Sequence, residues 1–466
     1  MKKKVGLLFI LCISSSLCFS QLQSHVDERM ELVGIVFRLA GAEEYVNNQV
    51  KNYVSDIDAY FAPYKEHPLI QYVKKIRERD EVAYNAVSRT IDFLEIKNGQ
   101  VRLSPHADLN CLLQDSRWTK ESFLAYVQLL NRFYKDSKFR AFFDKHKTLY
   151  AETEKRFNSF LSNIHTEWFN GFFGQALTAP FVCVSLTNGP SNYGGTTCLS
   201  NIPNGEIIIG CSRVDSAGIP IFEEYDFDRF SVILHELCHI FSEPLINKYQ
   251  QDMIPAADSI FPYVKKQLAK VAYGDAATML GESINDLCTN MYFREYPIGF
   301  GKYMIRFNED YGFIWMRRFV KFMDNFYGHR NLYPYFEDFM PQIVSFINFC
   351  GNNIEKIVFE YEHSHPYVIN VFPALNSVVS TDVKEIRVDF SQPMWNSYGI
   401  SKVNRDDVFS PVKGQYHWNE DRSSFYIPVS LEKGKDYGVL LPKGIFQSFE
   451  TFPMKEDFEI IFKTED

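Results

Sequence analysis

The strongest constraint in this 466-residue sequence is a pair of histidines, His235 and His239, which stand four residues apart around Glu236. Four residues advance an α-helix by just over one turn, so both imidazoles lie on one side of the segment if it is helical. The apolar residues around the pair recur at helical spacing, and Asp226 or Asp228 can cap the start of the helix. The spacing therefore predicts a helix on which both histidines can bind one metal ion, with Glu236 beside it.

A third protein ligand is required, because a catalytic zinc ion commonly has three protein ligands and one open position. The metzincin arrangement is excluded, since Ser242 and Leu245 stand where it requires glycine and histidine. Downstream, Glu282 and Asp286 are again four residues apart within a helical pattern of apolar residues. The alternative carboxylate ligands in the sequence are Glu243, Glu295 and Glu309.

Together the two motifs, HExxH at 235–239 and ExxxD at 282–286, resemble those of the gluzincins, the thermolysin-like zinc peptidases. The resemblance implies that Glu282 is the third Zn²⁺ ligand and that Asp286 accepts a hydrogen bond from one of the two histidines. It also implies that Glu236 takes the proton of a zinc-activated water during the hydrolysis of a peptide bond.

The same resemblance implies a peptide or protein substrate lying along an edge strand that precedes the motif helix. The segments 181–186 and 206–210 are the candidates for this strand, and 187–195 is expected to be a loop that can sit at the cleft. Gluzincins also use a Tyr or His donor toward the developing oxyanion. Spacing does not choose among three downstream candidates, which are Tyr311, Tyr327 and His329.

Other interpretations of these residues stay open at the level of the sequence. An HExxH run can lie on an exposed helix without a metal, and Cys238 fits helix packing better than metal ligation. A zincin-like fold can also bind a partner without hydrolysing it, with the C-terminal region serving surface attachment. The intact histidines and glutamates of both motifs favour the enzyme, because a degenerate site is expected to lose at least one of them.

The hydrophobic pattern changes twice along the chain and predicts a multi-domain protein. Residues 21–172 repeat apolar side chains at helical spacing, which predicts a helical N-terminal region. In 173–365 short strands precede helices, which indicates an α+β, zincin-like domain. Residues 366–466 contain short strands separated by turns and predict an all-β sandwich. The run VDFSQPM at 388–394 resembles a signature of bacterial immunoglobulin-like modules, which implies that fold here.

Composition and the N-terminus restrict the partners and the location. The net charge is −9 and basic blocks are missing, so nucleic acid is not the expected partner. A basic start, an apolar run over 5–13 and small residues before Gln21 predict a signal peptide over 1–20. The protein is therefore expected to be exported, to a periplasm, a cell surface or the medium. Acylation at Cys18 is less favoured because Leu17 is bulky, and no later apolar run is long enough for a transmembrane helix.

Seven cysteines follow the predicted leader, so at least one of them has no intramolecular partner. Three of the seven fall close together in the strand-rich stretch, and any disulfide is expected to come from Cys183, Cys198 and Cys211.

Overall fold

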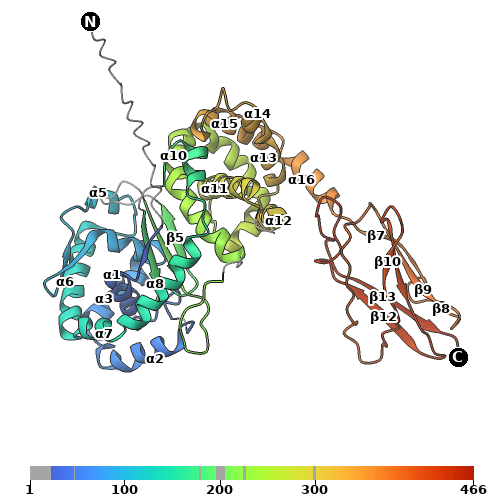
Figure 1. Ribbon diagram of the computed structural model, residues 1–466, viewed down its shortest axis with the longest axis horizontal. Helices are drawn as coiled ribbons and strands as arrows, with labels where there is room; N and C mark the ends of the chain where they lie inside the picture. The colour runs from blue at the N-terminus through green and yellow to red at the C-terminus, as the bar shows by residue number, and fades with distance from the viewer. Residues whose placement is uncertain (1–21, 47, 178–179, 196–204, 224–226, 298–300) are drawn as a thin grey trace, which may run out of the picture. The chain divides into compact units, whose positions relative to one another are not determined.

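The structure is a computed structural model that describes residues 22–46, 48–177, 180–195, 205–223, 227–297 and 301–466. The predicted signal peptide and Cys198 lie outside the described residues. The protein is multi-domain, with many helices and several small sheets (Figure 1). Within the described part of the chain, no helix combines the length and apolar character needed to cross a membrane.

The chain divides into two compact units. The first contains Met1–Tyr249, Ile284–Ile298 and Asn325–Pro341, and the second contains the remaining segments. Two long helices, α10 (Phe227–Leu268) and α11 (Ala276–Glu295), each contribute residues to both units.

The N-terminal part of the first unit is built from helices around an aromatic core. Helix α6 shows how the sequence specifies them: Thr119 and Ser122 form a capping box at its start. Its buried residues Phe123, Tyr126 and Leu130 then follow at spacings of three and four. The helices of this part are α1 (Glu28–Leu39), α2 (Lys51–Tyr60), α3 (Pro68–Asp80), α4 (Asn85–Ser88), α5 (Leu109–Leu112), α6 (Lys120–Asp136), α7 (Phe139–Lys145), α8 (Lys147–Leu161) and α9 (Glu167–Phe173).

The N-terminal region is not purely helical, which corrects the prediction for 21–172. It contains a hairpin, β2 (Leu94–Lys97) and β3 (Gln100–Leu103), and a short strand, β1 (Ser24–His25). Strand β1 pairs in parallel with β4 (Phe181–Ser185), 156 or more residues later in the chain. A strand of two residues has no readable alternation, so only this long-range pairing reveals it.

Strand β1 belongs to a four-stranded sheet with the order β1-β4-β6-β5, where β6 is Glu206–Gly210 and β5 is Asn192–Gly195. Strands β4 and β6 each have a neighbour on both sides, so neither predicted substrate strand lies at an edge. The edge strand is β5, antiparallel to β6, within the segment predicted as a loop. Its Gly194 and Gly195 have low strand propensity, and pairing with the buried β6 overrides that preference.

Helices dominate the chain from α10 onward until the C-terminal strands begin. After α11 they are α12 (Gly301–Tyr311), α13 (Met316–Phe322), α14 (Asp324–Gly328), α15 (Phe336–Asn352) and α16 (Ile354–Ser364).

The C-terminal segment forms two sheets around one apolar core, as the alternating pattern predicts. One sheet has the order β10-β11-β9-β7 and the other β12-β13-β8. The core takes residues from both, including Val388, Phe425, Val439 and Phe462. The strands are β7 (Val368–Phe372), β8 (Val378–Val379), β9 (Glu385–Phe390), β10 (His417–Trp418), β11 (Ser424–Pro428), β12 (Asp436–Leu441) and β13 (Phe458–Thr464).

The structure describes two of the three cysteines that were expected to supply a disulfide. Cys183 and Cys211 are free and fully buried, and burial raises the pKa of both thiols. Cys111, outside the strand-rich stretch, is disulfide-bonded. Disulfides of Cys183 and Cys211 are therefore excluded, whereas Cys198, the third cysteine expected to pair, lies outside the described residues.

Candidate metal centre

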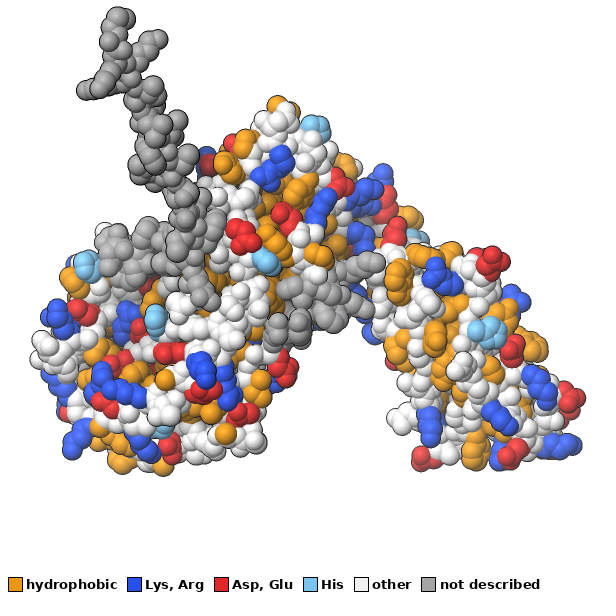
Figure 2. All heavy atoms as spheres, viewed as in Figure 1, with side chains coloured by type: hydrophobic (Ala, Val, Ile, Leu, Met, Phe, Trp, Pro, Cys, Tyr) orange, Lys and Arg blue, Asp and Glu red, His pale blue; other side chains and the backbone are white. Residues whose placement is uncertain are grey.

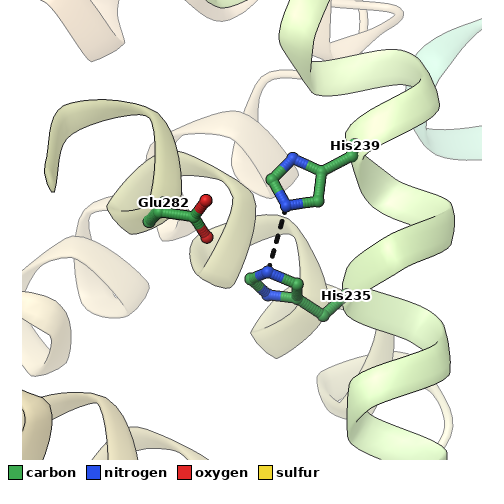
Figure 3. Close-up of side chains that lie close together, drawn as sticks. All are labelled: His235, His239 and Glu282. Atoms are coloured by element: carbon green, nitrogen blue, oxygen red, sulfur yellow. Dashed lines mark hydrogen bonds between the residues drawn. The ribbon is translucent and has the colours of Figure 1, made fainter. Parts of the chain in front are cut away.

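Helix α10 presents the two histidines of the first motif on one side. The Nε2 atoms of His235 and His239 lie 3.1 Å apart, with the rings nearly perpendicular (Figure 3). Two nitrogens bound to one tetrahedral Zn²⁺ at about 2.05 Å would be separated by about 3.3 Å. The observed separation is therefore close to that of two ligands of one ion.

Glu282 on α11 points its carboxylate toward the two imidazoles (Figure 3). One ligand atom from each of His235, His239 and Glu282 can be chosen so that all three lie within 4.8 Å of one another. All three residues are partly exposed. The structure thus brings together the three predicted ligands, with two imidazole nitrogens and a carboxylate oxygen as the donor set.

Asp286, one helical turn after Glu282, fixes the orientation of the first histidine. Its Oδ1 lies 2.8 Å from Nδ1 of His235, and its side chain is only 7% exposed. Because an ionised carboxylate can only accept, Nδ1 of His235 carries the proton and donates it. The lone pair of neutral His235 is then on Nε2, the atom that faces His239.

Two buried polar side chains join α10 to α11 beside the cluster. Asn285 donates from Nδ2 to the backbone carbonyl of His235 at 2.9 Å, and it accepts from the hydroxyl of Ser242 at 2.7 Å. Both Asn285 and Ser242 are fully buried. These bonds hold the histidine-bearing turn of α10 against α11, which limits the movement of the ligands.

Glu236 lies against the edge strand of the sheet. A Cβ added at Gly194 of β5 would come within 2.5 Å of the Glu236 carbonyl oxygen and 2.8 Å of its Oε2. Only glycine allows such a close approach of the two backbones. The side chain between the two histidines therefore faces β5, and Glu236 is not among the clustered ligand atoms.

Tyr273 is a neighbour of the cluster that sequence reasoning missed. Its hydroxyl donates to Oε2 of Glu282 at 3.1 Å, and its ring stacks on Phe313 at an interplanar angle of 17°. Tyr273 lies nine residues before Glu282, outside the helical repeat of α11, so periodicity gave no signal for it.

The alternative ligands are engaged elsewhere in the described residues. Glu309 forms a two-bond ion pair with Arg317, and Glu295 accepts from Trp168 and Tyr327. Two further candidates, Glu243 and Cys238, also stay outside the cluster. Glu243 lies near Gly195, whose added Cβ would be 3.2 Å from its Oε2, and the thiol of Cys238 is buried with a raised pKa.

The predicted oxyanion donors are placed as follows. Tyr327 donates its hydroxyl to Glu295 at 2.7 Å, and burial raises its pKa. His329 is exposed and its Nδ1 lies 2.9 Å from the carbonyl oxygen of Asn325. Tyr311, the last residue of α12, is 42% exposed. These side-chain bonds of Tyr327 and His329 go to Glu295 and Asn325, which lie outside the cluster.

A profile described as "Domain of unknown function (DUF4932)" matches residues 22–346, more than half of the chain. The chain belongs to the DUF4932 family. The match includes α10 and α11 with all the clustered residues, and it ends before the sandwich strands begin. The DUF4932 description carries no activity.

Other comparisons add little to the family assignment. No curated protein matches the chain. Two solved structures, "surface layer protein SbsC, domains 1-6" and "S-layer protein rSbsC(31-844)", are similar at 11% identity each, with TM-scores of 0.19 and 0.18. Each alignment covers 86% of this chain, which spans 46% of the length of the S-layer chain.

Proposed function

We propose that this DUF4932 protein is a zinc-dependent peptidase with a gluzincin-like site and a C-terminal immunoglobulin-like module. The observation that carries the proposal is the convergence of His235, His239 and Glu282, with Asp286 holding the first histidine in the metal-binding tautomer. Two imidazoles and one carboxylate are a donor set that suits a catalytic Zn²⁺ with one open position.

The residues present fit Zn²⁺ on two counts. The facing Nε2 atoms have nearly the separation of two zinc ligands, and the Asp286–His235 bond is the carboxylate–histidine support common at such sites. Zn²⁺ held there would act as a Lewis acid and make water nucleophilic near neutral pH.

The side chains around the proposed metal site have different roles in the reaction. Glu236, next to the cluster and against β5, accepts the proton of the attacking water and passes it to the leaving amine. Asp286 keeps the His235 ring in place, and Tyr273 holds Oε2 of Glu282. The Asn285 bonds keep the two helices in register throughout.

Strand β5 is the proposed binding site for an extended peptide. It is the last strand of the described sheet and it lies against Glu236, so a peptide paired with it would run past the general base. Main-chain hydrogen bonds to an edge strand hold a substrate without reading its side chains. This assigns to β5 the role that the sequence gave to β4 or β6.

The decisive experiment compares wild type with Glu236→Gln on a peptide library, with bound zinc measured on the same samples. Glutamine keeps the shape but cannot take the proton, so turnover should fall by about 10²–10⁴-fold while zinc content stays unchanged. Glu337→Gln on α15, whose carboxylate bonds Lys248 at the surface, is the matched control and should keep wild-type turnover.

The outcomes separate the two function classes. Equal turnover by Glu236→Gln would remove Glu236 as the base. A wild type that binds zinc but cleaves nothing would instead support a zincin-fold binding protein.

A further inference from the structure

One fully buried carboxyl group in the first unit has no part in the proposed reaction. Helix α1 buries eight consecutive residues, 30–37, and Glu31 is the only one of them that can carry a charge. Charged side chains are spread over the face of the molecule drawn in Figure 2, whereas Glu31 is 0% exposed. Burying an ionisable group is costly unless hydrogen bonds compensate it, so the groups that bond Glu31 indicate what it holds in place.

Glu31 accepts hydrogen bonds from two separate parts of the chain. Its Oε1 accepts from the hydroxyl of Ser185 and from the backbone N–H of Leu186, both at 2.8 Å. Its Oε2 accepts from the hydroxyl of Tyr53 on α2 at 2.9 Å. The first oxygen therefore holds the end of β4, whereas the second bonds a helix.

The same face of α1 is shaped to receive the residues at the end of β4. Gly34 comes three residues after Glu31, and a Cβ added there would be 2.1 Å from Oγ1 of Thr187, so only glycine fits. Ser185 and Thr187 are at most 3% exposed, and their hydroxyl oxygens lie 3.2 Å apart. Glu31 and Gly34 thus form one docking site for 185–187, where the connection from β4 to β5 begins.

A turn carries this anchorage on to β5. The backbone N–H of Asn188 donates to Oγ of Ser185 at 3.2 Å, and its side-chain Nδ2 donates to the carbonyl of Ser191 at 2.7 Å. The N–H of Gly210, the last residue of β6, donates to the same carbonyl at 3.1 Å. Strand β5 begins at the next residue, so its start is fixed by bonds that lead back to Glu31.

An edge strand depends on such an anchor more than a central strand does. In the described sheet β5 has a hydrogen-bonded neighbour on one side only, and two of its four residues are glycines. Glycine loses more conformational freedom on folding than any other residue, so the sequence of β5 holds the strand weakly. The position of Gly194 against Glu236 therefore depends on where the preceding turn is held.

We propose that Glu31 is a positioning residue of the peptidase, which acts through Ser185 and the 188–191 turn to place β5 for peptide binding. The inference rests on the proposed function, because it takes β5 as the peptide-binding strand. The metal ligands and Glu236 lie on α10 and α11, so loss of the anchor leaves the reacting groups in place. A change that weakens the binding of substrate and transition state alike raises KM and keeps kcat.

The test compares two substitutions in the full-length protein, each of which removes one hydroxyl donor from Glu31. Ser185→Ala breaks the link to β5, and Tyr53→Phe, the matched control, breaks a bond of nearly the same length on the other oxygen. Ser185→Ala should raise KM for peptides by about tenfold, with kcat and zinc content near wild type. Tyr53→Phe should keep the wild-type KM. Glu31→Leu removes both acceptors and should raise KM at least as much as Ser185→Ala.

Equal rises in KM for Ser185→Ala and Tyr53→Phe would show that Glu31 only stabilises the fold, and would overturn the proposal. A wild-type KM in Ser185→Ala would overturn it as well. The comparison of these two variants decides the matter even where Glu31→Leu does not fold.

Hydrogen exchange over 188–195 gives a readout that does not need turnover. Exchange there should be faster in Ser185→Ala than in wild type and unchanged in Tyr53→Phe. If wild type cleaves no peptide, the proposed function fails and exchange alone decides the placement of β5. Faster exchange in Ser185→Ala than in Tyr53→Phe would then support the anchor, and equal exchange would exclude it.

Discussion

Helix α11 and the C-terminal sandwich differ in what they bury: the helix buries polar side chains, whereas the sandwich buries apolar ones. Between 283 and 290, α11 buries five polar side chains, Ser283, Asn285, Asp286, Thr289 and Asn290. The sandwich core is apolar, and its most buried members include Val388, Phe425 and Phe462. A helix can bury polar groups only when each finds a partner, as Asn285 and Asp286 do on α10.

The two regions therefore have different roles: the buried residues of the sandwich contribute to stability, whereas those of α11 position the candidate metal ligands. The core of the sandwich is stabilised mainly by the burial of apolar area. The α10–α11 pair gives up apolar contact to hold ligands in one orientation, which suits a metal centre. If this distinction is right, damage to the sandwich core should cost stability and leave the metal, whereas damage to α11 should cost the metal first.

The largest effect is expected from Phe425→Ala. Phe425 is fully buried, and the centroid of its ring lies 4.8 Å from that of Trp418 and 5.3 Å from that of Phe446. Removing it should destabilise the sandwich by about 3–5 kcal/mol. Differential scanning calorimetry with zinc analysis should show a lower sandwich transition and full metal content. Loss of zinc in this variant would show that the two regions are coupled.

A buried carboxyl group of the first unit should make stability depend on pH. Burial raises the pKa of Glu31 to about 7, although Ser185, Leu186 and Tyr53 donate hydrogen bonds to it. The folded protein then keeps a proton that the unfolded chain releases near pH 4.5. The free energy of unfolding should therefore fall as pH rises from about 4.5 to about 7, by about 3 kcal/mol.

Denaturant titrations of wild type and Glu31→Gln across this range isolate the contribution. Glu31→Gln should lack this pH-dependent part of the free energy of unfolding. The difference in unfolding free energy between wild type and Glu31→Gln should therefore change with pH between about 4.5 and about 7. In the sandwich, Asp389 shows the opposite shift from Glu31. Hydrogen bonds to its carboxyl group outweigh the effect of burial and lower its pKa. A constant difference between wild type and Glu31→Gln would contradict the assignment.

Asp286→Asn should weaken zinc binding by about 10–100-fold, since His235 loses its charged partner. Competition with a chelator measures the affinity directly. Asp389→Asn removes a comparable hydrogen-bonded carboxylate from the sandwich and should leave zinc affinity unchanged. Equal affinities for wild type and Asp286→Asn would mean that the Asp286–His235 bond does not support the ligand.

The smallest effect is expected from Tyr273→Phe, which removes one hydrogen bond to Glu282 and keeps the ring stacked on Phe313. Zinc affinity should fall by about tenfold, at the lower end for a residue that supports a ligand. Tyr398→Phe in the sandwich, where the side chain is 50% exposed, serves as the control with no expected change. A fall in turnover at full zinc occupancy would instead give Tyr273 a direct part in the reaction.

The sequence determined those features that depend on short-range periodicity. The spacings of four residues at His235 and Glu282 predicted two helices with ligands on one side, because a helix maps such spacing onto one face. The alternating pattern after 366 predicted the strands of the sandwich for the same kind of reason.

Only the tertiary structure decided the features that depend on partners distant in the chain. Strand β5, rich in glycine, is a strand because β6 pairs with it, and β1 exists only through β4. Tyr273 reaches Glu282 from outside the helical repeat, and Cys111 is disulfide-bonded although it lies outside the cysteine-rich stretch. Local sequence carries propensity and period, whereas edges, close approaches and long-range bonds arise when distant segments pack together.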